Sequence, residues 1–293
     1  CTIVKTVGSS PRPVGSMLTC LATGESAGSL SGGCVEEDFL QRLAMGSVDV
    51  TRPHLIEYGV TAEQNEKLGL PCGGRLVVLV QQLNTGDLDW LASLNAALAS
   101  RECTIRILDL KTGATSLRPI DRFTPLAYTG SQLQHCLGPQ MRMLLVGAGQ
   151  LARTLAELAL AMDYEVLVTD PRQTLLDQWQ GPEVPLLQGM PDDIVMAKAA
   201  DRFSIIITLT HDPRIDDMAL MVALETEAWY VGALGSLRTT DKRRQRLRSL
   251  GLSESALERL HAPVGLPIGS KTPVEIAVAV MAEITRLRHR SSG

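Results

Sequence analysis

Residues 142–152 read RMLLVGAGQLA, and this stretch decides the fold of the C-terminal half. The apolar run before the glycines predicts a buried strand, and the apolar residues after them predict a helix. The pattern G-x-G-x-x-A between a strand and a helix is typical of dinucleotide-binding turns. In such a turn Gly147 permits the tight bend, Gly149 lets a pyrophosphate approach the backbone, and Ala152 keeps the helix close to the sheet.

A second strand is expected over residues 165–169, and Asp170 ends it. An acid at this place binds a ribose hydroxyl in nucleotide-binding folds of this type. Arg172 follows closely and could instead favour a 2′-phosphate. The alternative is a scaffold of this fold that holds no nucleotide.

Strands and helices alternate through the rest of the C-terminal half. Further strands are expected at 204–210 and 229–233, with helical patterns between them. This alternation predicts an α/β fold over residues 139–293, a Rossmann-like doubly wound parallel sheet. The last helix has a capping box at Thr272–Glu275, with Pro273 at its first position.

The N-terminal half has a different composition. Gly, Ser and Pro crowd residues 8–16, and a helix is expected over 34–45. The prolines of residues 117–140 predict an irregular linker, and we place the domain boundary there. The sequence therefore predicts an N-terminal α+β, cysteine-containing domain that, with the linker, spans residues 1–138.

The composition excludes several classes of function. A net charge of −4 and a pI near 5.8 lack the basic balance of a nucleic-acid binder, and 3% aromatic residues argue against single-strand stacking. No apolar run reaches the ~18 residues of a membrane span, and no signal peptide is visible. We therefore expect a cytoplasmic protein with no nucleic-acid or membrane partner. Because the chain begins at Cys1 and not at Met, we also expect a missing N-terminal segment.

Two of the six cysteines lie beside pairs of glycines. Cys34 opens an expected helix, whose dipole favours the thiolate, although Glu36 and Glu37 oppose this effect. A thiolate binds soft metals and takes part in sulfur transfer, and glycines leave room for a bulky ligand to reach sulfur and backbone N–H groups. The candidate contacts for such a ligand are Cys34, Cys72, Gly32, Gly33, Gly73 and Gly74, with Arg12 as a candidate phosphate ligand.

The alternative for any cysteine is a small buried apolar side chain. We keep that interpretation for Cys20, Cys103 and Cys136, which lie in strand-like runs or in the expected linker. For Cys34 and Cys72 both interpretations stay open.

Polar residues follow the expected strand at 204–210. His211 lies where open α/β sheets bind ligands, and it could carry a proton or bind a metal. The alternative is that Asp212 and Pro213 simply begin the next helix. The basic run 242–248 predicts a solvated helix face, or else a docking surface for an acidic partner.

Eight motifs, in the same order along the chain, make the sequence similar to the XdhC/CoxI family of xanthine dehydrogenase accessory proteins. They are GSSPRPVGS (8–16), SLSGGCVEE (29–37), GLPCGG (69–74), LLVGAGQLA (144–152), VTDPR (168–172), THDPRIDD (210–217), YVGALGS (230–236) and VGLPIGSKTPVEIAVAVMAEI (264–284).

The resemblance implies a molybdenum cofactor-binding accessory protein, a chaperone for the pterin dithiolene that carries Mo. Such a protein protects the cofactor during sulfuration and helps insert it into a xanthine dehydrogenase-type molybdenum hydroxylase. The implied partners are that hydroxylase and a cysteine desulfurase, and a homo-oligomer is a further expectation. The resemblance makes Cys34 the first candidate Mo ligand and Cys72 the second.

One departure concerns the nucleotide turn, which commonly reads GAGHVA in this family. Here Gln150 and Leu151 replace the His and the Val. A Gln side chain can form hydrogen bonds, but it cannot act as an acid or base or as a strong metal ligand. The substitution therefore argues against a reaction catalysed at this turn.

Two rival functions remain. One is an NAD(P)-dependent oxidoreductase, which would bind NAD(P) or another nucleotide at the turn and use His211 as acid or base. The other is a protein adaptor whose Rossmann-like domain is an interaction surface.

Overall fold

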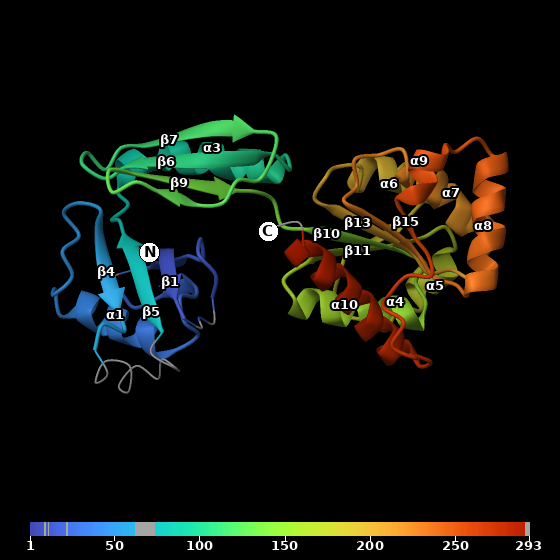
Figure 1. Ribbon diagram of the computed structural model, residues 1–293, viewed down its shortest axis with the longest axis horizontal. Helices are drawn as coiled ribbons and strands as arrows, with labels where there is room; N and C mark the ends of the chain where they lie inside the picture. Colours follow the sequence, from blue (N-terminus) through green and yellow to red (C-terminus); the bar gives the residue numbers. More distant parts are fainter. Residues whose placement is uncertain (9, 11, 22, 62–73, 291–293) are drawn as a thin grey trace. The chain divides into compact units, whose positions relative to one another are not determined.

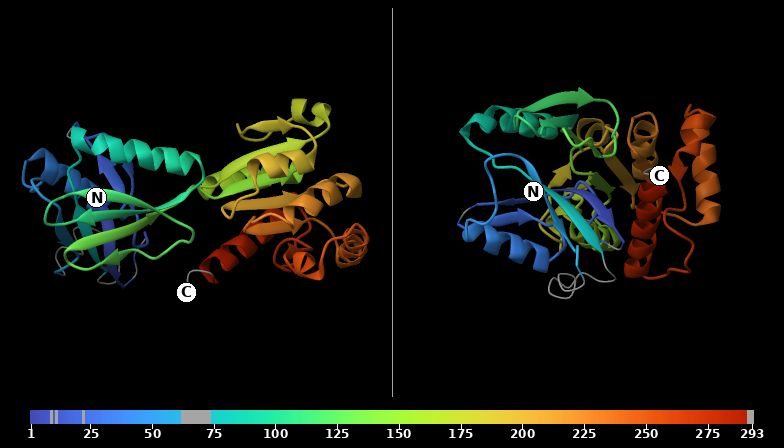
Figure 2. Two further views of the ribbon diagram at one scale, coloured as in Figure 1. Left: turned by 90° about the horizontal axis from the view of Figure 1, so that it is seen from above. Right: turned by 60° about the vertical axis from the view of Figure 1, so that its left-hand side comes forward.

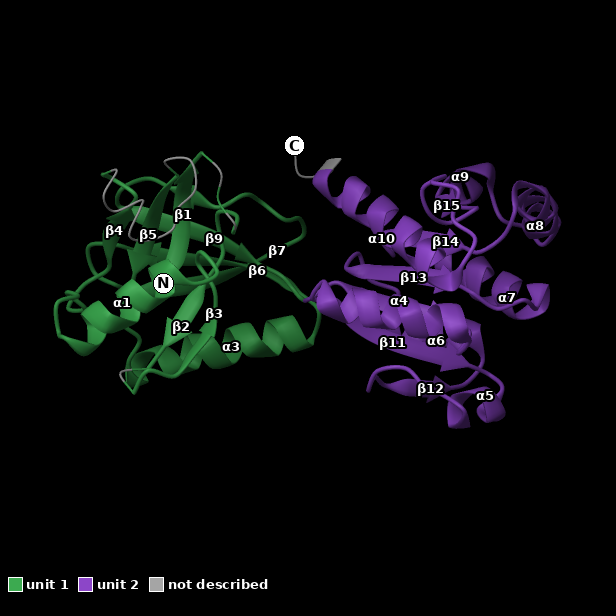
Figure 3. Ribbon diagram, turned by 90° about the horizontal axis from the view of Figure 1, so that it is seen from below, with its two compact units in different colours: residues 1–139 green, residues 140–293 purple. Residues whose placement is uncertain are grey.

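The computed structural model describes residues 1–8, 10, 12–21, 23–61 and 74–290. The chain divides into two compact units, which we name unit 1 (Cys1–Pro139) and unit 2 (Gln140–Gly293) (Figure 3). Each unit has hydrophobic clusters of its own. None of the helices among the described residues combines the length and the hydrophobicity that a membrane span requires.

Unit 2 is built on a parallel sheet. Within residues 140–290, six strands pair in the order β12-β11-β10-β13-β14-β15. They are β10 (Arg142–Val146), β11 (Glu165–Asp170), β12 (Leu186–Gln188), β13 (Ser204–Thr208), β14 (Tyr230–Ala233) and β15 (Leu260–His261). All neighbouring strands are parallel, and the order is that of dinucleotide-binding folds. The predicted doubly wound sheet is confirmed.

Helices cover both faces of this sheet (Figures 1 and 2). Met143 and Leu145 of β10 pack under α4 and α10, whereas Leu144 and Val146 pack under the helices of the other face. Both sides of β10 are therefore buried, which explains its continuous apolar run. The helices are α4 (Gln150–Ala161) and α10 (Pro273–Arg290) on one face, and α6 (Pro191–Lys198), α7 (Pro213–Ala223), α8 (Leu237–Ser249) and α9 (Glu254–Glu258) on the other.

Unit 1 begins with an antiparallel sheet that carries a helix. The strands β1 (Thr2–Val7), β5 (Arg75–Val80) and β4 (His54–Tyr58) pair in that order. Helix α1 (Cys34–Ala44) buries Val35 in the same apolar cluster as strand residues of this sheet, so its amino end is held at a fixed place on unit 1. A short hairpin joins β2 (Leu18–Cys20) to β3 (Ser26–Gly28).

In the described residues, the second part of unit 1 is a four-stranded sheet, where the sequence predicted an irregular linker. Residues 117–140 are not an irregular linker, because they contribute to a four-stranded antiparallel sheet within the described residues. Its strands are β6 (Cys103–Asp109), β7 (Thr115–Ile120), β8 (Ala127–Tyr128) and β9 (Gln132–Leu137), next to α3 (Leu88–Ala99) and the short helix η2 (Thr85–Asp87). Pro119 is tolerated because β7 is an edge strand of this sheet.

Candidate functional site

One carboxylate organises the loop that precedes α1. Glu36, in the first helical turn, accepts hydrogen bonds from all four backbone N–H groups of residues 30–33, at 2.7 to 3.1 Å. The hydroxyls of Ser29 and Ser31 donate to the same carboxylate, at 2.8 and 2.5 Å. Burial alone would raise the pKa of Glu36, but the hydrogen bonds, above all those from Ser31, outweigh it and hold the pKa well below its ordinary range. The ionised carboxylate therefore fixes the shape of this loop.

Cys34 is presented by this loop. It is the first residue of α1 and its side chain is exposed. Gly32 has a φ of +88°, a conformation that favours glycine. A Cβ at Gly32 or Gly33 would meet no atom within 4 Å, so open space adjoins the sulfur-bearing end of the helix. The sulfur therefore stands at the amino end of α1, beside this open space.

The backbone N–H groups of Gly32 and Gly33 are already hydrogen-bonded and are not free to bind a ligand. We expected the glycines to offer N–H groups to a ligand, but the N–H groups of Gly32 and Gly33 donate to Glu36 at 3.0 and 3.1 Å. A ligand at this place would meet the Cys34 sulfur and the bare glycine Cα atoms. The role of Glu36 was missed, although Glu at the third helical position is the spacing of a capping box.

Two further unit 1 candidates, Arg12 and Gly74, lie among the described residues. Arg12 is exposed, and its carbonyl accepts a hydrogen bond from the Ser10 hydroxyl at 2.8 Å. Gly74 is buried, and a Cβ at Gly8 would lie 3.5 Å from the Gly74 Cα, so Gly8 and Gly74 lie close together. The described contacts do not bring Arg12 or Gly74 to Cys34. Cys72 and Gly73 lie outside the described residues.

Unit 2 has a cavity of about 320 Å³ at the carboxyl edge of its sheet, where β10 and β13 lie side by side. We name it the crevice. Its lining brings together four of the predicted site residues, which are Gly147, Gly149, Ala152 and His211. Arg172 and Lys271 add two positively charged side chains to the wall. The crevice thus lies where the strand order of the sheet reverses, between β10 and β13, which is the place where open α/β sheets bind ligands.

The two glycines of the turn have different roles. Gly147 has a φ of +112°, and a Cβ there would lie 2.8 Å from Cγ2 of Thr210, so this glycine lets the turn pack against the loop after β13. Gly149 has an ordinary φ of −91°, and a Cβ there would meet nothing within 4 Å. Gly149 therefore leaves open space in front of the first turn of α4, whose N–H groups and dipole favour an anion.

Asp170 does not offer a free carboxylate. It is fully buried and accepts hydrogen bonds from the Ala148 N–H at 3.0 Å and from the Arg172 N–H at 3.0 Å. The Arg172 guanidinium adds two more, from Nε at 2.8 Å and from Nη2 at 2.9 Å. Burial would raise the pKa of Asp170, but these bonds from Arg172 and Ala148 lower it overall. The acid expected at a ribose instead ties the nucleotide turn to Arg172.

The same tripeptide, Asp-Pro-Arg, recurs after β13. Asp212 caps α7 by accepting the Arg214 N–H at 3.0 Å, and the Arg214 guanidinium donates to it through Nε and Nη2 at 3.1 and 2.8 Å. The capping role that we set against a catalytic role is therefore confirmed for Asp212. His211, one residue earlier, is exposed and lines the crevice.

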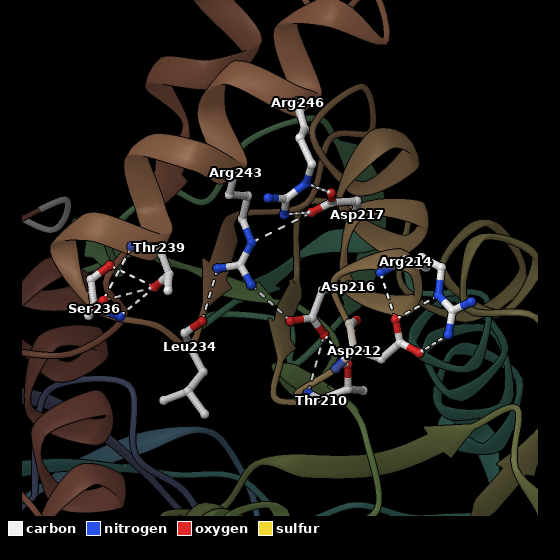
Figure 4. Close-up of polar contacts among 10 residues, drawn as sticks. All are labelled: Thr210, Asp212, Arg214, Asp216, Asp217, Leu234, Ser236, Thr239, Arg243 and Arg246. Carbon is white, nitrogen blue, oxygen red and sulfur yellow. Dashed lines mark hydrogen bonds and ion pairs between the residues drawn. The ribbon is translucent and has the colours of Figure 1, made fainter.

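A buried ion pair between Asp216 of α7 and Arg243 of α8 lies next to Thr210, which lines the crevice (Figure 4). Arg243 donates to Asp216 and to the carbonyl of Leu234, both at 2.9 Å, and its side chain is only 7% exposed. Thr210 donates to the other oxygen of Asp216 through its hydroxyl at 2.7 Å. Burial raises the pKa of Asp216 to about 6, against the hydrogen bonds from Thr210 and the charge of Arg243. The loop after β13 is thus fastened to α8.

A second cavity, of about 420 Å³, adjoins the first. The two share Thr210, His211 and Leu234, so the crevice continues along the sheet edge from β10 toward β14. Lys242 lines this second part. Within the described residues, no group of three or more His, Cys, Asp or Glu side chains gathers to hold a metal ion.

The basic run of α8 is solvated only in part, since Lys242 and Arg248 are exposed while other members have partners within unit 2. Arg243 is buried, and Arg246 pairs with Asp217 through Nε and Nη2, at 2.6 and 3.0 Å. Arg244 donates to the carbonyls of Leu257 and Leu260. These three arginines have partners within unit 2, and the docking surface for an acidic partner stays a prediction.

The fold and the site define a class of protein: a dinucleotide-type α/β unit with a positively charged crevice, in one chain with an α+β unit that presents an exposed cysteine. Sequence models of two domains match this chain, the XdhC Rossmann domain over residues 143–284 and the XdhC and CoxI family over residues 1–59. The chain belongs to the XdhC and CoxI family.

Two relatives match over nearly the whole chain. A Bacillus subtilis protein, named as a probable xanthine dehydrogenase component, is 27% identical, over 99% of this chain and 92% of the relative. The "Molybdenum cofactor insertion chaperone PaoD" of Escherichia coli is 26% identical, over 98% of this chain and 82% of the relative. A crystal structure described as a xanthine dehydrogenase (BH1974) from Bacillus halodurans shares the fold, with a TM-score of 0.76 and 23% identity over 99% of this chain and 90% of that chain.

Proposed function

We propose that this chain is a molybdenum cofactor-binding accessory protein that helps insert the cofactor into a xanthine dehydrogenase-type hydroxylase. Membership of the family and the likeness to an insertion chaperone support this proposal. The observation that carries it is the exposed Cys34 at the amino end of α1, on a loop fixed by Glu36 and next to open space.

The cofactor is the cargo of this protein, and its dithiolene and Mo are soft partners for a thiolate. In our proposal Cys34 contacts the cargo through sulfur, while Gly32 and Gly33 let it approach closely. Cys72, Gly73 and Gly74 form the second predicted contact, and Arg12 remains a predicted phosphate ligand. A contact through one exposed sulfur suits a carrier that must later release its cargo.

The proposal extends to sulfuration. A bound cofactor would be held while a cysteine desulfurase supplies its terminal sulfur, and both that enzyme and the hydroxylase would be cytoplasmic partners. A homo-oligomer would be compatible with either step.

Activation of the target hydroxylase tests this function. Apo-hydroxylase, released cofactor and the wild-type chain are combined under anaerobic conditions, and hydroxylase activity is measured over time. We expect Cys34→Ala to lose most of the stimulation, while Cys20→Ala, a matched thiol change in the same unit, keeps it. Equal stimulation by wild type and Cys34→Ala would reject the role of Cys34.

We propose nucleotide binding as a second activity, located in unit 2. The observation that favours it is the crevice, where Gly149 leaves open space before α4 and Arg172 and Lys271 supply positive charge. NAD(P) or another nucleotide would fit this chemistry. A hydride-transfer reaction has weaker support, because His211 is the single predicted acid or base there.

A further inference from the structure

The carboxylate that would read a ribose diol is occupied in this protein. Asp170 is fully buried, and four donors surround it: the Ala148 N–H and three groups of Arg172. A ribose diol needs a carboxylate oxygen that can accept its hydroxyl hydrogens. Reading a diol here would require breaking charge-assisted hydrogen bonds of Arg172, which are about twice as strong as neutral ones.

The side chain that blocks Asp170 also faces the crevice. Arg172 lines the cavity and its side chain is 45% exposed. Nε and Nη2 point to Asp170, which leaves the Nη1 edge of the guanidinium for a ligand.

The side chains that line the two cavities carry more positive than negative charge. The carboxylate at the end of β11 and three that follow β13 are each bound by an arginine, in the pairs Asp170–Arg172, Asp212–Arg214, Asp216–Arg243 and Asp217–Arg246. Lys271 and Lys242 also line the two cavities, and in the described part of the chain neither has a carboxylate partner within ion-pair distance. An added phosphate group would therefore meet these positively charged side chains. The carboxylate of Glu275, beside Lys271, accepts the backbone N–H groups of Lys271 and Thr272.

We propose that the crevice of unit 2 selects a nucleotide that carries a phosphate on its ribose, as NADP(H) does, and that Arg172 reads this phosphate. The inference rests on the nucleotide binding proposed above and is independent of the role of Cys34. Arg172 acts as a specificity-determining residue: its fork holds Asp170 away from the diol, and its free edge donates to the phosphate. NAD(H) lacks the phosphate that Arg172 would bind, and its ribose diol cannot bind the occupied Asp170.

The test compares NADPH and NADH binding to the full chain by calorimetry at fixed salt. Wild type should bind NADPH about 10- to 100-fold more tightly than NADH, which corresponds to one charged hydrogen-bonded contact. Arg172→Ala should remove most of this preference by weakening NADPH. As a control, Arg202→Ala changes another exposed, ion-paired arginine, which precedes β13 at the opposite edge of the sheet, and should keep the preference.

Three results would overturn the inference. Equal or tighter binding of NADH by wild type rejects it without any variant, so misfolding of Arg172→Ala cannot hide the answer. An unchanged preference in a folded Arg172→Ala protein removes the role of Arg172. No binding of either nucleotide rejects the nucleotide activity as a whole, and with it this inference, while the cofactor function of unit 1 stands.

Discussion

The carboxylate of Glu36 accepts both the backbone N–H and the hydroxyl of Ser31, at 2.8 and 2.5 Å. Through this pair and the neighbouring N–H groups, one acidic side chain shapes the loop that presents Cys34. Glu36 is therefore a positioning residue, and Cys34 is the residue that we expect to touch the cargo.

Replacing Glu36 should loosen this loop. In Glu36→Gln the carboxylate loses its charge and one acceptor oxygen, so several backbone donors lose good partners. We expect the free energy of unfolding to fall by about 1–3 kcal/mol, measured by urea denaturation. Glu37→Gln, one residue along on the exposed side of α1, should change it by less than about 0.5 kcal/mol. Similar losses in both variants would contradict the special role of Glu36.

The contribution of Glu36 to stability should depend on pH. Because the pKa of Glu36 is lower in the folded chain than the ordinary 4.5, the folded state binds fewer protons than the unfolded state below that pH. The stabilisation by Glu36 should be complete above pH 4.5 and should decrease as the pH falls below it. Denaturation curves at a series of pH values should show a shallower acid loss in Glu36→Gln than in wild type. A parallel loss in the two proteins would show that Glu36 does not titrate in this way.

Two arginines of α8 should contribute very differently to the free energy of unfolding. Arg243→Ala leaves Asp216 buried without its charge partner, and we expect a loss of about 3–5 kcal/mol in stability. Arg248→Ala, on the same helix, removes an exposed ion pair with Glu254, and we expect a much smaller loss of stability. Thermal and urea unfolding of the two variants measure the difference. Equal effects would mean that the Asp216–Arg243 pair carries no particular weight.

The two glycines of the nucleotide turn should separate stability from binding. Gly149→Val places its side chain in open space at an ordinary φ, so the fold should persist while nucleotide binding weakens at least about tenfold. Gly147→Ala forces a Cβ toward Thr210 at a φ of +112° and should cost about 1–3 kcal/mol in stability. Calorimetric titration and denaturation measure the two effects. Unchanged binding in Gly149→Val would place the nucleotide elsewhere.

Much of unit 2 could be predicted because its strands are buried on both faces and read as short apolar runs. Its short elements were missed, since the three residues of β12 and the two of β15 carry no periodic pattern. The strands after residue 114 were hidden by prolines and polar residues, which edge strands tolerate.

The candidate site was predictable at the level of motifs but not of hydrogen bonds. The glycines of the nucleotide turn and Cys34 could be identified from residue type and spacing alone. The occupied state of Asp170 depends on the direction of the Arg172 side chain, and the burial of Arg243 depends on how α7 packs against α8. Such relationships arise from tertiary packing, which a charge pattern along the chain does not encode.

Cys34 is the residue that we expect to hold the molybdenum cofactor. The direct measurement is anaerobic binding stoichiometry, with molybdenum and pterin quantified after gel filtration of the chain with released cofactor. We predict that wild type and Cys20→Ala retain stoichiometric cofactor and that a folded Cys34→Ala retains little. Full retention of molybdenum and pterin by Cys34→Ala would show that Cys34 does not hold the cofactor.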